Sequence, residues 1–160
     1  MSAKPITGGC QCGAVRYSCE SLGRPSICHC RMCQKAFGNF FAPLVTGIGV
    51  EWTRGTRKIF HSSNSNMRGF CENCGTPLTY EHETYGIEIA IGTLDNPDIA
   101  IPQLQVNLHD ERACFAKLAQ TPKPTEKQLE SLNTWNGQVV SYQHPDHDTE
   151  VWPPEQFQKT

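Results

Sequence analysis

Short stretches in which apolar and polar positions alternate recur along most of the chain and predict β-strands. They cover residues 14–19, 40–45, 58–61, 77–81, 86–91 and 104–109. Turn-forming residues lie between them, including Gly55, the Ser/Asn run at 62–66 and the segment 95–97. We expect residues 20–27, which include Gly23 and Pro25, to form a loop. Because this part of the chain has little helical periodicity, the pattern favours a mainly β domain with short helices.

Two segments carry helical signals. Residues 34–37 predict one short turn of helix. Residues 125–128 have the spacing of a capping box, Leu129 and Leu132 recur on one side, and Gly137 offers a stop. We therefore expect one C-terminal helix, whose simplest role is packing.

The chain becomes polar and proline-bearing beyond residue 141. We expect an extended or loosely attached segment there. The predicted organisation is a domain over residues 1–141 followed by a polar C-terminal tail over residues 142–160. His144 and His147 lie in this tail, and we expect them to be solvated rather than bound to a metal.

Size and charge narrow the class of protein. A chain of 160 residues builds a single core most simply. Its formal charge of −2 and pI near 6.3 argue against nucleic acid as a partner, because polyanion binders usually carry a basic face. No apolar run approaches the roughly 20 residues that span a bilayer, and the first residues contain no apolar segment. We expect a soluble, cytoplasmic protein with no membrane partner; oligomeric state is left open.

Nine cysteines are present, an odd number for a disulfide framework. Seven of them fall into C-x-C and C-x-x-C spacings. In a reducing compartment such spacings indicate metal binding, and zinc is the metal that thiolates favour in structural sites.

Spacing divides these seven cysteines into a group of four and a group of three. Cys10 and Cys12 are two residues apart, so both would project from one face of an extended segment. Cys71 and Cys74 have knuckle spacing, with Gly75 easing the turn. Joining the two pairs would make one closed structural site and would tie distant parts of the sheet together.

The remaining three, Cys28, Cys30 and Cys33, lack a fourth ligand nearby. An open fourth position is the usual difference between a catalytic and a structural zinc site. Its occupant could be water, a substrate or a protein side chain from far away in the sequence. His29 would point away from the side shared by Cys28 and Cys30, so we expect it to be a hydrogen-bonded or packing residue and not a ligand. The isolated Cys19 and Cys114 are expected to be small buried residues.

Four segments together resemble the glutathione-dependent formaldehyde-activating enzyme family, also called the GFA or CENP-V/GFA domain. They are GCQCGAVRY at residues 9–17, CHCRMCQK at 28–35, RGFCENCGTPL at 68–78 and GTLDNP at 92–97. Three cysteine clusters in this order and context are far more specific than one C-x-x-C. Family members often have Ala-Pro-Trp where this chain has Ala113-Cys114-Phe115, which bears on substrate choice more than on fold.

The resemblance implies a zinc-stapled β-tent fold with two zinc ions per chain. Carried over by position, the structural zinc would be held by Cys10, Cys12, Cys71 and Cys74, and the catalytic zinc by Cys28, Cys30 and Cys33. The implied activity is that of a carbon-sulfur lyase similar to S-(hydroxymethyl)glutathione synthase. Its small-molecule partners would be glutathione, or a similar thiol, and formaldehyde or another aldehyde.

An anionic thiol would need cationic side chains or backbone N–H groups close to the triplet. Arg68 and Lys35 lie within the matching segments and are candidate substrate contacts, with Phe40 as a candidate pocket wall. The alternative interpretation is a zinc-built binding module without catalysis, because fold does not fix function. A fourth protein ligand at the triplet, or a filled pocket there, would favour that alternative.

Overall fold

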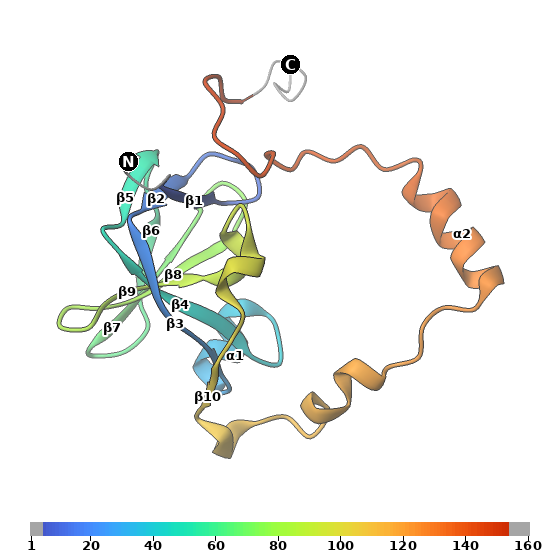
Figure 1. Ribbon diagram of the computed structural model, residues 1–160, viewed down its shortest axis with the longest axis horizontal. Helices are drawn as coiled ribbons and strands as arrows, with labels where there is room; N and C mark the ends of the chain where they lie inside the picture. Colours follow the sequence, from blue (N-terminus) through green and yellow to red (C-terminus); the bar gives the residue numbers. More distant parts are fainter. Residues whose placement is uncertain (1–4, 154–160) are drawn as a thin grey trace.

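Two antiparallel-rich sheets form the body of the protein in the computed structural model, which describes residues 5–153 (Figure 1). The smaller sheet has the order β1-β2-β5, with β1 at Ile6–Gly9, β2 at Arg16–Cys19 and β5 at Glu51–Arg54. The larger sheet has the order β10-β3-β4-β9-β8-β7-β6. Its strands are β3 at Ser21–Cys28, β4 at Ala42–Ile48, β6 at Lys58–His61, β7 at Asn66–Phe70, β8 at Pro77–His82, β9 at Gly86–Ala90 and β10 at Leu104–Val106.

Helices are few, and the mainly β prediction is confirmed. Helix α1 spans Arg31–Phe37 and ends at Gly38, whose left-handed φ of 57° suits glycine. Helix α2 spans Glu126–Asn136. Short 3₁₀ helices lie at Ile91–Thr93, Pro97–Ala100, Leu108–Asp110 and Phe115–Gln120. Among the helices that the structure describes, none has the length and apolar character needed to cross a bilayer.

The core lies between the two sheets. Tyr17 of β2, Val45 of β4 and Ile89 of β9 are completely buried there. Because side chains alternate along a strand, the neighbours Leu44 and Thr46 of β4 project to the opposite face of the larger sheet, beside the cysteine triplet. The larger sheet therefore has one face in the core and one face that carries a candidate site.

The loop expected over residues 20–27 is wrong: this segment is strand β3, between β10 and β4. Gly23 and Pro25 indicated a loop, but the register shifts between Leu22 and Pro25. Such an irregularity lets a strand accommodate a proline that cannot donate to the ladder. As a result the strand delivers Cys28 directly to the triplet.

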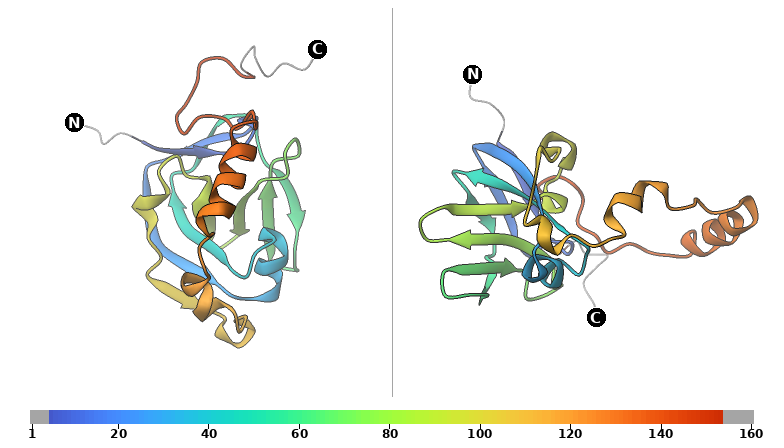
Figure 2. Two further views of the ribbon diagram at one scale, coloured as in Figure 1. Left: turned by 90° about the vertical axis from the view of Figure 1, so that its right-hand side faces the viewer. Right: turned by 90° about the horizontal axis from the view of Figure 1, so that it is seen from below.

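The C-terminal helix is confirmed, including its capping box between Thr125 and Gln128, but its expected packing role is wrong. None of its residues is buried, and Leu129, Leu132 and Trp135 are about half or more exposed. Figure 2 shows this part of the chain standing away from the sheets. We call residues 116–142 the arm.

Residues 143–153 return from the arm to the body of the protein. His144 is only 4% exposed, so the expectation of a solvated histidine is wrong for this residue. Its backbone N–H donates to the carbonyl of Gln11, 2.8 Å away. We call residues 143–152 the strap; residues 154–160 of the expected tail lie outside the described part of the chain.

Candidate metal centres

The first candidate centre joins two turns at one end of the sheets. Cys10 and Cys12 lie in the turn between β1 and β2, and Cys71 and Cys74 lie in the turn between β7 and β8. The four Sγ atoms are all within 4.8 Å of one another. The pairing is the one that spacing predicts, although Cys10 and Cys12 converge through a tight turn and not along an extended segment.

Hydrogen-bond donors surround these sulfurs. The N–H of Val15 donates to Sγ of Cys10 at 3.3 Å, and Nδ2 of Asn73 donates to Sγ of Cys12 at 3.1 Å. Burial alone would raise the pKa of the Cys74 thiol, but hydrogen bonds from Thr76 lower it to about 6. Donors of this kind favour thiolate, the form in which cysteine binds metals, whereas burial raises the pKa of the Cys10 and Cys71 thiols.

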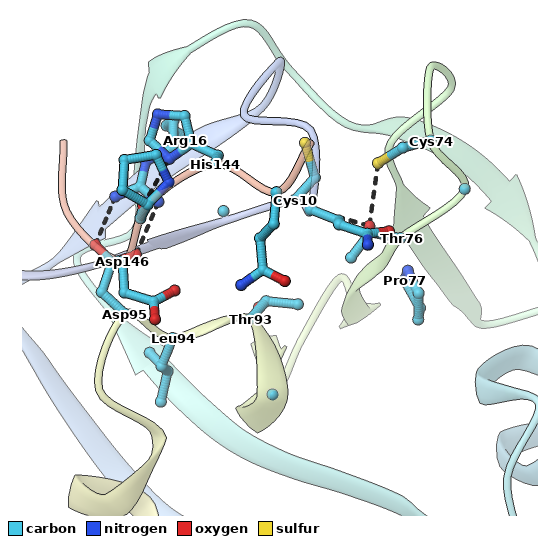
Figure 3. A pocket seen from close by; sticks show the side chains of 16 residues that line it. Cys10, Arg16, Cys74, Thr76, Pro77, Thr93, Leu94, Asp95, His144 and Asp146 are labelled. Atoms are coloured by element: carbon cyan, nitrogen blue, oxygen red, sulfur yellow. Dashed lines mark hydrogen bonds and ion pairs between the residues drawn. The ribbon is translucent and has the colours of Figure 1, made fainter. Parts of the chain in front are cut away.

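The strap covers part of this centre. The indole Nε1 of Trp152 donates to the carbonyl of Cys12, and Asp148 pairs with Arg16 at 2.8 Å. A cavity of about 420 Å³ lies between the strap and the turns (Figure 3), with His144 and Arg16 on one side and Cys74 on the other. The strap therefore fixes the surroundings of the four-cysteine group.

The second candidate centre lies where β3 passes into α1. Cys28 ends β3, Cys30 is the N-cap residue of α1, and Cys33 lies in the first turn of that helix. Their Sγ atoms are within 4.8 Å of one another. In the part of the chain that the structure describes, no histidine, cysteine, aspartate or glutamate joins them as a fourth ligand.

Two side chains donate to the triplet. Nδ2 of Asn107 donates to Sγ of Cys28 at 3.2 Å, and Nη2 of Arg68 donates to Sγ of Cys33 at 3.4 Å. The hydrogen bond from Cys33 lowers the pKa of Cys28 to about 5, although burial opposes this. The triplet therefore contains at least one sulfur whose surroundings favour negative charge.

A cavity of about 430 Å³ adjoins the triplet. Besides the three cysteines, it is lined by Arg24, Ser26, Met32, Leu44, Thr46, Arg68, Tyr80, Glu88, Leu104, Val106 and Asn107. Arg68 is only 7% exposed, and its Nη1 has no hydrogen-bond partner among the described residues. An unpaired buried guanidinium nitrogen is costly, so this nitrogen is available to an acceptor that enters the cavity.

His29 packs under the triplet, as the sequence predicts. Its ring is completely buried, its Nε2 lies 2.9 Å from Oε1 of Gln105, and Phe115 stands edge-on to it at 4.6 Å. The amide of Gln34 donates to the His29 carbonyl. These contacts fix the backbone between Cys28 and Cys30.

The three expected substrate contacts are placed differently. Arg68 lines the cavity beside the triplet. Lys35 is exposed and lines a neighbouring cavity of about 460 Å³, in which Arg68 also takes part. Phe40 is 45% exposed and lines neither cavity, so this geometry gives no support to it as a pocket wall.

Sequence reasoning missed Asn107, Tyr80 and Glu88 as cavity residues. Each lies in or beside a segment predicted as a strand, and strand alternation gives the face only when the face of one neighbour is known.

The two isolated cysteines differ in burial. Cys19 is buried as expected, but the expectation of burial is wrong for Cys114, which is exposed just before the arm.

Comparison with known proteins identifies the family. A crystal structure of a Rhodobacter sphaeroides protein, Northeast Structural Genomics target RhR83, is similar at 19% identity and a TM-score of 0.49, over 62% of this chain and 99% of its own. No curated protein matches the chain in sequence. The family model described as glutathione-dependent formaldehyde-activating enzyme (GFA) matches residues 5–110, and the chain therefore belongs to this family.

Proposed function

We propose that this protein is a zinc-dependent carbon-sulfur lyase that makes or breaks adducts between a thiol and an aldehyde. The closest activity is that of S-(hydroxymethyl)glutathione synthase, with glutathione and formaldehyde as partners. One observation carries the proposal: three thiols converge beside a cavity, and no fourth described ligand joins them. A three-ligand site with a free position is typical of catalytic zinc.

The donor sets fit zinc at both centres. Four thiols within 4.8 Å of one another suit a closed tetrahedral site, and three suit a site that takes one exogenous ligand. N–H donors on Cys12, Cys28 and Cys33 offset part of the negative charge that several thiolates would gather. When bound at the triplet, zinc would hold a sulfur as thiolate or polarise a carbonyl oxygen. We propose two zinc ions per chain on these grounds.

Arg68 is the proposed anchor for an anionic substrate. Its Nη2 is engaged with Cys33 and its guanidinium lies 4.9 Å from the ring centroid of Tyr80, which leaves Nη1 directed to a ligand acceptor. Arg24 lines the same cavity from an exposed position on β3. A thiol that carries carboxylates, as glutathione does, would supply the acceptors that both arginines need.

The test combines metal content with an exchange assay. We expect about two zinc ions per chain and faster exchange between formaldehyde, glutathione and their adduct, measured by exchange NMR. In Cys30→Ser the acceleration should disappear and about one zinc ion should remain while the fold survives. The matched control is Cys114→Ser, at an exposed cysteine outside both groups, which should behave as the unaltered protein does. A folded protein with two zinc ions that accelerates no thiol and aldehyde pair would reject the enzyme and favour a binding module.

A further inference from the structure

A row of polar side chains crosses the larger sheet below the cysteine triplet. Arg68 of β7 lies opposite Tyr80 of β8, Tyr80 lies opposite Glu88 of β9, and Glu88 lies opposite Thr46 of β4. Residues directly opposite each other in a sheet share a face. All four line the cavity beside the cysteines.

Glu88 differs from the other members of this row. It is the one carboxylate among the described residues that line the cavity. It is half-buried, and it forms no hydrogen bond or ion pair within the described residues. Arg68, the cation in this row, contacts Cys33 and Tyr80 and forms no ion pair with Glu88. A partly buried carboxylate without a partner is available to whatever occupies the cavity.

The proposed reaction needs a proton carrier. When a thiol adds to an aldehyde, a sulfur electron pair forms the new carbon-sulfur bond and the carbonyl π pair moves onto oxygen. The proton lost from sulfur must reach that oxygen to give the hydroxyl group. No oxidant, reductant or third reactant takes part, so one group that accepts and then returns a proton completes the balance.

We propose that Glu88 is this proton-transfer residue, taking the proton from the substrate thiol and returning it to the carbonyl oxygen; the inference rests on the proposed function. In the reverse direction it removes the hydroxyl proton and protonates the departing sulfur. Its position on a central strand, between β8 and β4, fixes the carboxylate on the cavity face.

The electrostatic surroundings suit this role. Burial is the main reason that the pKa of Glu88 is raised above its usual range. A carboxyl that ionises closer to neutral pH exchanges protons more readily than an ordinary one. The other titratable or charged groups lining this cavity are Tyr80 of β8, Arg68 of β7, Arg24 of β3, Cys30 and Cys33.

The test measures the exchange rate of zinc-loaded protein against pH, with zinc content and circular dichroism recorded for each variant. In Glu88→Gln, kcat should fall about 100-fold or more while KM changes little. The dependence of kcat on ionisation of this carboxyl should vanish. The matched control is Glu51→Gln, an exposed strand glutamate of the smaller sheet, which should leave the rate and the pH profile unchanged.

Two results would overturn the inference and leave the proposed function standing. In the first, Glu88→Gln keeps kcat and raises only KM, which would assign Glu88 to binding, for example of a substrate ammonium group. In the second, Glu88→Gln keeps both the rate and the pH profile. A zinc-loaded wild-type protein without any acceleration would instead reject the proposed function and this inference together.

Discussion

Arg68 links the cysteine triplet to the cavity through one guanidinium group. It donates to Cys33, lies over Tyr80 and keeps Nη1 without a described partner, although the side chain is only 7% exposed. A group of this kind is stabilised by its contacts on one side and lacks an acceptor on the other. An anionic ligand can supply the missing hydrogen-bond acceptor.

Replacing Arg68 tests whether that acceptor belongs to the substrate. Arg68→Gln should raise KM for glutathione about 10- to 100-fold, because a hydrogen bond to a charged group contributes about 1.5 to 3 kcal/mol. KM for a neutral thiol such as 2-mercaptoethanol should change much less. Steady-state kinetics with both thiols, on protein of verified zinc content, measure the difference. Equal losses for the two thiols would show that Arg68 acts on the sulfurs alone.

At the scale of elements, the sequence predicts strands well where alternation is clear, as in β6, β8 and β9. The prediction fails where a residue that usually interrupts strands is accommodated by pairing within the sheet. Pro25 indicates a loop locally, but pairing on both sides of β3 and a shifted register accommodate it. Cysteine grouping was predictable because metal geometry follows from short spacings. The row of side chains that contains Glu88 was not predictable, because it depends on the register of four strands, which the sequence does not specify.

Helix α2 shows the opposite case, in which local signals predict the helix correctly but no packing supports it. Its capping box and Gly137 define the ends, yet none of its residues is buried. A helix of 11 residues falls below the roughly 12 to 15 residues at which an isolated helix becomes even marginally stable in water. We therefore expect α2 to open often.

Hydrogen exchange tests this expectation. Amides of α2 should be at least about 1,000-fold less protected than those of β4, which pairs on both sides. Thr125→Ala removes the cap and should lower the protection of α2 further while leaving β4 unchanged. Protection of α2 equal to that of β4 would contradict the expectation and would show that the arm is covered in solution.

At the scale of the whole molecule, the strap ties the C-terminal part of the chain to the four-cysteine end, and His144 makes that contact sensitive to pH. Burial, together with the positive charges of Arg16 and Arg54, lowers the pKa of His144, although the Pro145 carbonyl and Asp95 oppose this. A histidine that is neutral in the folded protein ionises near pH 6.5 when unfolded. Its contribution to stability is therefore complete above that pH and is lost as the pH falls through the lower, folded-state pKa.

Acidification should loosen the strap. The His144 amide, which donates to Gln11, should lose protection from hydrogen exchange as the pH falls below about 6.5, after correction for intrinsic rates. In His144→Gln the amide should show a much flatter dependence, since the replacement does not titrate. If protection of the His144 amide in the wild-type protein instead rises on acidification, the prediction that protonation of His144 loosens the strap is wrong.

The two cysteine groups should contribute to stability unequally, because they connect different lengths of chain. The four-cysteine group joins the β1–β2 turn to the β7–β8 turn, so a metal bound there would close a long loop and hold both sheets. Zinc binding at such a site contributes on the order of 10 kcal/mol in small domains. Cys71→Ser should therefore lower the free energy of unfolding by several kcal/mol, as a strong zinc chelator should, whereas a thiol reductant alone should not.

The triplet provides the matched comparison. Cys28, Cys30 and Cys33 lie within one strand-to-helix connection, which the contacts of His29 and Gln34 already fix. A metal bound there would close only a short loop, so Cys30→Ser should change the free energy of unfolding far less than Cys71→Ser does. Denaturant unfolding of both variants, with zinc content measured beforehand, compares the two. A larger loss of stability in Cys30→Ser would assign the main structural role to the triplet. It would then contradict the proposal that the triplet is the catalytic centre and the four-cysteine group the structural one.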